Sequence, residues 1–250
     1  KSDISVLILG PTGSDVGRGT AAGYVNMNTK AARLNPGYAA TYAYGNADQK
    51  RFTVDLGRPV AIGKPGSWLS KTAARLNGLW QDGGVPGRQF VENKSQAIAP
   101  SLGLGLGTPT RLSFGAQFMR QDNRPDYGVP GGAWLDKALA PTTELASRAV
   151  DQSNYYGSLG HDFDRARQDS YTARVEQDLN SRLTLRNQTR YNRTSREAVI
   201  TSIANPAAFV ASTGLVTLSH QGNERENTIL SNQTNLVGRF ATGSIQHAVN

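Results

Sequence analysis

The sequence predicts an all-β protein, specifically part of an antiparallel transmembrane β-barrel. Apolar and polar residues alternate with a period of two in about eight segments, as they do in strands that have one apolar face. The connections between these segments are alternately short and long, as in barrels with tight turns at one rim and long loops at the other. No run of apolar residues is long enough for a membrane helix, but barrel strands are only half apolar, so the negative mean hydropathy does not exclude a barrel.

The alternation is clearest at residues 111–118, where Leu112, Phe114, Ala116 and Phe118 are separated by polar residues. The same split recurs at 171–179 and at 182–191, where arginines occupy the polar positions. Weaker versions predict further strands at 38–45, 51–57, 69–80, 95–104 and 226–237.

Short connections are predicted at 105–109 and 179–182 from their Gly, Pro, Asn and Ser content. Long loops are predicted at 81–94, 121–168 and roughly 195–225. Compact soluble domains rarely carry a structureless loop of nearly fifty residues, since most of their connections have about four to six. The loop lengths therefore favour a barrel over a soluble β-sandwich or solenoid, which the strand pattern alone leaves open.

A membrane-spanning sheet must pair all its backbone amides and turn an apolar face to lipid. An arginine in the middle of the lipid face costs about 2–4 kcal/mol, so arginines at alternate strand positions belong on the enclosed side. We therefore predict that the lumen is lined by Arg174, Arg182, Arg186 and Arg190.

Other functions have little support in the sequence. The net charge of +8 is dispersed and forms no basic run, which argues against a nucleic-acid partner. The Gly-rich stretch after residue 9 leads into the alternating segment 24–29 rather than a helix, which argues against a phosphate-binding loop. There is no cysteine, and the three histidines have no metal-ligand spacing. Asp162 and Asp164 could bind Ca²⁺, although a solvated loop is the simpler interpretation. No catalytic motif is present, and we predict neither an enzyme nor a cofactor.

The chain is also expected to be a fragment. Lys1–Asp3 leads into an apolar run of about six residues, which is too short for a signal peptide. The last residues, 242–250, read as a strand with no closing turn.

The stretch VLILGPTGSDVGRGTAAGYVNMNTK (6–30) resembles the end of the plug domain of TonB-dependent outer-membrane receptors. Together with LWQDGGVPGR (79–88), GLGTPTRL (105–112) and RQDNRPDYGVP (120–130), it resembles the catecholate siderophore receptor branch. The resemblance covers nearly the whole chain. The residues that carry its plug motif are Gly10, Pro11, Gly17, Arg18, Gly19, Gly23 and Asn26.

This resemblance implies a 22-stranded barrel with a plugged lumen, of which the chain would supply about eight or nine strands. Residues 1–34 would be the C-terminal part of the plug, and residues 35–250 the N-terminal strands of the barrel. One departure concerns the strand before the Gly-Pro turn. The family usually has charged residues there that tie plug to wall, whereas this chain has Val6 and Leu9.

The resemblance further implies import of a ferric siderophore through the bacterial outer membrane, energised by TonB with ExbB and ExbD. Iron would enter only as the siderophore complex, and the other partner would be outer-membrane lipid. Within the family, the alternative is a receptor for cobalamin or an oligosaccharide. Outside the family, the alternative is a soluble or surface β-sheet protein, such as an adhesin or a polysaccharide-binding protein.

Ferric catecholates are anionic and aromatic, so arginine and aromatic side chains in the long loops are the candidate contacts. Ordinary loop packing or an interfacial aromatic girdle is the alternative role for each of them. The loop 121–168 has five basic and seven acidic residues, which weakens the electrostatic argument. The candidate ligand-binding residues are Arg88, Arg124, Tyr127, Trp134, Tyr155 and Tyr156.

Overall fold

The computed structural model describes residues 4–9, 23–60, 62–129, 151–203 and 217–249. They form one antiparallel nine-stranded sheet in which every strand pairs with its neighbour in sequence, and a separate two-stranded hairpin. The hairpin consists of β1 (Ile4–Leu9) and β2 (Gly23–Asn28). The large sheet consists of β3 (Gly37–Gly45), β4 (Gln49–Pro59), β5 (Ala73–Val85), β6 (Arg88–Leu104), β7 (Thr110–Asn123), β8 (Phe163–Asp178), β9 (Leu183–Ile203), β10 (Leu218–Thr242) and β11 (Ile245–Val249).

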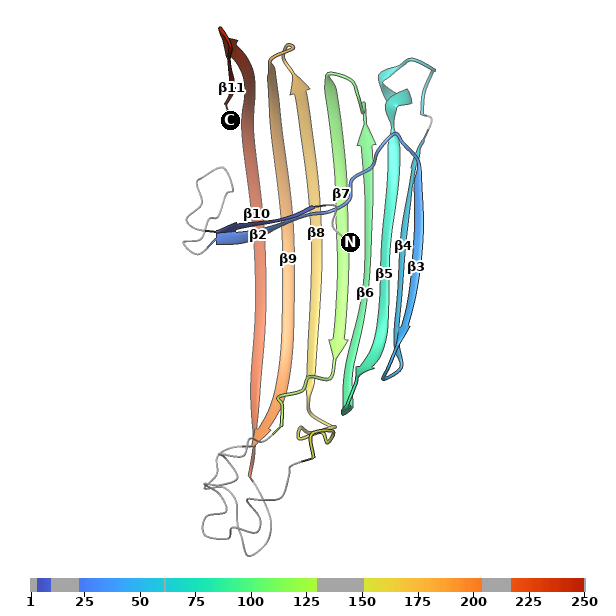
Figure 1. The fold of residues 1–250 in the computed structure, drawn as a ribbon, viewed down its shortest axis with the longest axis vertical. Helices are drawn as coiled ribbons and strands as arrows, with labels where there is room; N and C mark the ends of the chain where they lie inside the picture. Colours follow the sequence, from blue (N-terminus) through green and yellow to red (C-terminus); the bar gives the residue numbers. More distant parts are fainter. Residues whose placement is uncertain (1–3, 10–22, 61, 130–150, 204–216, 250) are drawn as a thin grey trace, which may run out of the picture.

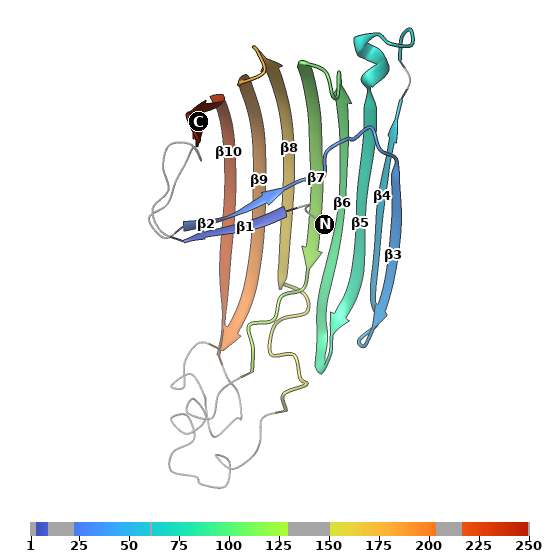
Figure 2. The same cartoon turned by 45° about the horizontal axis from the view of Figure 1, so that its top comes forward.

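The nine strands stand side by side in a curved wall, and the hairpin crosses in front of one face of that wall (Figures 1 and 2). The prediction of an all-β antiparallel sheet is confirmed, and the strand expected within 242–250 is the short β11. The two edge strands of the sheet, β3 and β11, do not pair with each other. The nine strands therefore form an open wall and not a closed barrel.

Several predicted boundaries are wrong, because most strands are longer than their apolar pattern. No long loop exists at 81–94, since β5 continues to Val85 and β6 begins at Arg88, leaving Pro86 and Gly87 as the turn. Gly87 has a φ of 74°, a backbone conformation that suits glycine. At the other end of β5, Trp68–Lys71 forms a 3₁₀ turn instead of the start of the predicted strand 69–80.

The remaining long connections are also shorter than predicted. The connection from β7 to β8 runs over 124–162, and that from β9 to β10 over 204–217. The 21 residues of β9 and 25 of β10 far exceed the roughly 9–11 residues that cross a bilayer. The part of β10 from Ser219 to Asn227 is polar on both faces, so the alternation disappears there although the backbone ladder to β9 continues.

Large apolar side chains are exposed on one face of the sheet, which we call the outer face. The register aligns one outer-face row across the strands from β3 to β10. This row contains Tyr38, Leu56, Leu76, Pro100, Ala116, Tyr171, Tyr191 and Leu230, and its first and last side chains are 64% and 72% exposed. Fully buried apolar residues in the described part of the chain are few: Ala32, Ala73, Val91 and Ala198. A water-soluble sandwich needs a buried core, which this sheet lacks.

The opposite, inner face is polar and carries three of the four predicted lumen arginines. Arg174 donates two hydrogen bonds to Gln188 Oε1, at 2.9 and 2.6 Å. Arg186 Nε contacts Glu176 Oε1 at 2.6 Å, and Arg190 bonds the Ser170 hydroxyl at 3.3 Å. The fourth, Arg182, lies in the β8–β9 turn and not in a strand, because Asn180 Oδ1 accepts the Arg182 and Leu183 amides and closes the chain reversal there.

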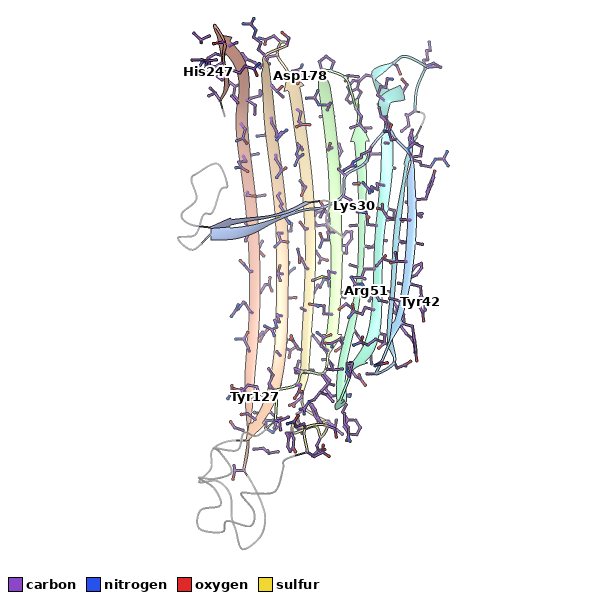
Figure 3. All side chains as sticks on the ribbon, in the orientation of Figure 1. Lys30, Tyr42, Arg51, Tyr127, Asp178 and His247 are labelled. Atoms are coloured by element: carbon purple, nitrogen blue, oxygen red, sulfur yellow. The ribbon has the colours of Figure 1, made fainter. Side chains whose placement is uncertain are left out.

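The segment after β2 is tied to the inner face by a three-residue ionic cluster. Asp55 on β4 accepts two hydrogen bonds from Arg75 on β5, at 2.7 and 2.8 Å, and also pairs with Lys30. Arg75 Nη1 in turn donates to the Ala31 carbonyl at 3.0 Å. Figure 3 shows Lys30 where the chain passes from the hairpin to the wall. The side chains of Lys30, Asp55 and Arg75 are only 21, 15 and 14% exposed, so the cluster is largely shielded from water.

Of the plug-motif residues, Gly23 and Asn26 belong to β2, and the others lie outside the described residues: Gly10, Pro11, Gly17, Arg18 and Gly19. The assignment of residues 1–34 to a plug and 35–250 to a barrel stays a prediction. The separate hairpin and the start of β3 at Gly37 agree with it.

Candidate ligand-binding rim

Five of the six candidate ligand residues lie in or beside the connections at one end of the sheet, and the sixth, Trp134, lies outside the described residues. Figure 3 places Tyr127 at this end and Asp178 at the opposite one. We call the β5–β6 turn together with residues 124–129 and 151–162 the rim. Two contacts bring its parts together: the Gln89 amide donates to the Ser153 carbonyl at 2.8 Å, and Glu92 and Arg124 form an antiparallel β-bridge.

Arg88, the first residue of β6, holds the two connecting segments of the rim together. Its guanidinium makes a two-bond pair with Asp126, at 2.6 and 2.8 Å, and donates a third bond to the Gln152 carbonyl. The Arg88 side chain is only 13% exposed. In this arrangement Arg88 organises the rim, and its charge is already matched by a carboxylate.

Arg124 has a similar structural environment. Its Nη1 lies 3.2 Å from Glu92 Oε1 and donates to the Phe90 carbonyl at 3.0 Å. Phe90 has a φ of 59°, which is rare for an aromatic residue, and its ring meets Tyr155 edge-on with centroids 6.5 Å apart. The sequence pattern gave no signal that Phe90, which is 53% exposed, belongs to this cluster.

Tyr155 belongs to a second network, centred on Asp162. The Tyr155 hydroxyl donates to Asp162 Oδ2 at 2.8 Å, and the Ser158 amide donates to the same oxygen at 2.9 Å. Thr201 on β9 donates to the other oxygen, Oδ1. Burial and the neighbouring Asp162 raise the pKa of Tyr155, so the phenol stays protonated and acts as a hydrogen-bond donor.

Asp162 and Thr201 were not predicted to act together, because 38 residues separate them in sequence and only the β8–β9 pairing joins them. The two carboxylates that could bind Ca²⁺ make other contacts. Asp162 accepts the hydrogen bonds of this network, and Asp164 forms a two-bond pair with Arg196. Within the described ranges there is no cluster of three or more metal-ligating side chains, and no helix long and apolar enough to span a membrane.

Two aromatic side chains remain accessible at the rim. Tyr127 is 63% exposed and Phe90 53%. Tyr156 instead donates its hydroxyl to the Asp151 carbonyl at 2.9 Å. Of the predicted contacts within the described residues, Tyr127 is therefore the one whose ring is exposed enough to stack on a ligand without breaking a contact.

No protein-family model matches the chain, but individual relatives do. It is 35% identical, over 97% of its length, to the catecholate siderophore receptor Fiu of Escherichia coli K12. It is 32% identical, over 96%, to the probable TonB-dependent receptor BfrD of Bordetella pertussis. The chain belongs to the TonB-dependent receptors. It spans about a third of the length of the curated relatives that it matches, 32% of Fiu and 31% of BfrD.

Solved structures of receptors show the same fold. The open form of the ferric-catecholate import receptor Fiu from E. coli superposes with a TM-score of 0.81 at 35% identity, covering 98% of this chain and 37% of that one. The siderophore receptor PiuA of Acinetobacter baumannii gives a TM-score of 0.75 at 26% identity, covering 95% and 32%. In a TonB-dependent receptor the wall of β3–β11 belongs to the barrel in the outer membrane.

Because of the Arg88–Asp126 pair, we expect the stability of the rim to depend on pH. Hydrogen bonding to Arg88 holds the pKa of Asp126 below its ordinary value of 3.8. A lowered folded-state pKa means that the stabilisation is complete above about pH 4 and is lost as pH falls through the lowered value. The Gly128 amide, which donates to Asp126 Oδ1 at 2.9 Å, should exchange with solvent faster below that pH, relative to intrinsic rates. Asp126→Asn should abolish this pH dependence of Gly128 exchange. If the pH dependence were unchanged in the variant, Asp126 would not be the group that titrates.

Proposed function

We propose that this chain is part of an outer-membrane importer of a ferric siderophore, most closely of the catecholate class, that is energised through TonB with ExbB and ExbD. Iron is cargo in this proposal, carried by the siderophore, and the protein needs no cofactor and catalyses no reaction. The observation that carries the proposal is the 35% identity, over 97% of the chain, to a catecholate siderophore receptor.

The two faces of the wall support the proposal. The outer face offers an apolar surface for outer-membrane lipid, and the inner face presents Arg174, Arg186 and Arg190. A cavity of about 500 Å³ lies between residues 29–32 and the wall, and these three arginines line it. A lumen with guanidinium groups suits the passage of an anionic chelate.

At the rim, Tyr127 would contact the ligand. Arg88 and Arg124 would hold the connecting segments in place. Catecholate rings are planar, so stacking on an exposed tyrosine is the contact that the geometry favours. Arg88 and Arg124 keep the rim in shape through their bonds to Asp126 and Glu92. If either arginine also contacts the siderophore, it does so while paired.

The transport test uses the complete receptor in a strain that lacks its own catecholate receptors. Growth under iron limitation on a ferric catecholate, lost when TonB is deleted, is the expected result. Growth on cobalamin or an oligosaccharide instead would replace the siderophore with that ligand. Detergent-free solubility of the complete protein would favour a soluble binding protein and contradict the proposal.

Tyr127→Ala is expected to weaken ferric-catecholate binding about fivefold, the loss of roughly 1 kcal/mol of stacking. Binding is measured by quenching of intrinsic fluorescence in detergent micelles. Tyr42→Ala is the matched control, because Tyr42 is equally exposed, at 64% against 63%, but lies on the outer face of β3. Equal affinities of the two variants would remove Tyr127 from the site without affecting the proposed transport.

A further inference from the structure

Two histidines that the proposed transport function does not use lie next to each other beside the rim. His161 precedes β8 and His220 lies in β10, so β9 runs between the strands that carry them. Their ring centroids are 5.2 Å apart and the ring planes differ by 36°. Both residues are exposed, so ions in the solvent have access to them.

Hydrogen bonds fix the proton position on His220. The single hydroxyl proton of Thr201 is donated to Asp162 Oδ1. The Thr201 oxygen, 2.9 Å from His220 Nδ1, must therefore accept a proton from that nitrogen. His220 consequently carries its proton on Nδ1 and presents the lone pair of Nε2, the form in which imidazole binds metals.

His161 is also held through Nδ1, and it presents Nε2 as an acceptor when its proton is on Nδ1 and is donated to the Ser158 hydroxyl. Its Nδ1 lies 3.0 Å from the Ser158 hydroxyl. Among the described residues neither histidine has a hydrogen-bond partner at Nε2. Each ring is thus anchored through one nitrogen and has the other available for a ligand.

The spacing of the rings matches coordination of one ion. Two imidazoles bound about 2.0–2.1 Å from a single ion at a near-tetrahedral angle place their ring centres about 5 Å apart. The observed separation is 5.2 Å. The chain Asp162–Thr201–His220 also has the order of the carboxylate-supported second shell that orients metal-binding histidines, with a hydroxyl between.

We propose that His161 and His220 form a site for a borderline divalent transition metal, Zn²⁺ or Cu²⁺, bound through their Nε2 atoms with water completing the coordination. Imidazole nitrogen is a preferred ligand of both ions. A bound ion would bridge the entry of β8 to β10 across β9. Because Asp162 also accepts the Tyr155 hydroxyl, the ion would stiffen the rim. The inference is independent of the identity of the transported ligand.

The test titrates Zn²⁺ and Cu²⁺ separately into the chelator-treated complete receptor in detergent, by calorimetry. We expect saturable binding of one ion that is lost in the double variant His161→Ala/His220→Ala and weakened about tenfold or more in either single variant. Thr201→Val, which keeps the shape of the side chain but removes the acceptor for His220, should also weaken binding about tenfold. His247→Ala is the control, since His247 stacks on Phe240 in β10 with centroids 4.9 Å apart, at the opposite end of the sheet (Figure 3).

A spectroscopic readout separates direct ligation from an indirect effect on folding. The electron paramagnetic resonance spectrum of the Cu²⁺-loaded receptor should show coupling to two imidazole nitrogens, and to one in each single variant. Unchanged metal binding in the double variant would overturn the proposal, as would a wild-type spectrum without imidazole coupling. Loss of binding in His247→Ala, with both rim histidines intact, would overturn it too.

Discussion

Phe114→Arg is expected to prevent most of the receptor from assembling in the outer membrane. Phe114 lies in β7 within the apolar band of the outer face, where it is 46% exposed. Its cross-strand partners are Leu102 on β6 and Ala173 on β8, so no carboxylate stands beside it to neutralise a guanidinium. Placing arginine at the middle of a lipid-facing strand costs about 2–4 kcal/mol. The amount of receptor in purified outer membranes, and its unfolding by urea in lipid vesicles, measure the effect.

Ser113→Arg provides the matched control, because Ser113 is the adjacent residue of the same strand and points to the inner face. Its partner on β8 is Arg174, so the new guanidinium would meet a polar wall rather than lipid, with a like-charge repulsion from Arg174 of about 0.2–1 kcal/mol. Assembly of Ser113→Arg should stay within about twofold of wild type, since exposed polar sites on a lumen wall tolerate charge. If both variants assembled equally well, or Ser113→Arg failed and Phe114→Arg did not, the assignment of the two faces would be wrong.

The face assignment is the part of the fold that sequence could predict. In β7, lipid on one side and polar groups on the other impose alternation on the sequence itself, so Leu112, Phe114 and Phe118 reveal both the strand and its orientation. The physical cause is local, because each residue faces one environment or the other regardless of the rest of the chain.

Strand ends could not be predicted in the same way. Beyond the apolar band β10 reads Ser219-His220-Gln221-Gly222-Asn223, with no apolar face, and only backbone pairing to β9 continues the strand. Such pairing is set by the neighbouring strand and leaves no period in the sequence. The two-residue turn at Pro86 and Gly87 was missed for the same reason.

The candidate site shows a similar limit. Arginine and tyrosine were chosen for the chemistry of the ligand, and the structure does bring Arg88, Arg124 and Tyr155 to one end of the sheet. The sequence could not show that their partners are Asp126, Glu92 and Asp162, because these pairs form only when distant segments meet. Of the chosen residues, Tyr127 keeps its ring accessible.

The ionic cluster on the inner face ties the segment after β2 to the wall without any charged side chain at Val6 or Leu9 of β1. Asp55 is the centre of the cluster, since it accepts two bonds from Arg75 and also pairs with Lys30. Asp55→Ala would remove the anion that Arg75 and Lys30 share, at positions only 14 and 21% exposed. Losing one partner of a largely buried pair is strongly destabilising, because the remaining charge stays desolvated.

Asp55→Ala is therefore expected to lower the free energy of unfolding by about 2–4 kcal/mol, less than for a fully buried pair because some water reaches the cluster. Residues 29–31 should also become sensitive to protease, since Arg75 would no longer be held in position to bind the Ala31 carbonyl. Asp48→Asn is the control: Asp48 pairs with Lys50 at 2.8 Å but is 69% exposed, asparagine suits its φ of 56°, and loss of the charge should change stability by less than about 0.5 kcal/mol. Equal losses in the two variants would mean that the inner-face cluster does not hold the segment. Protease sensitivity at 29–31 in Asp55→Ala alone would instead identify Asp55 as the residue that holds this segment to the wall.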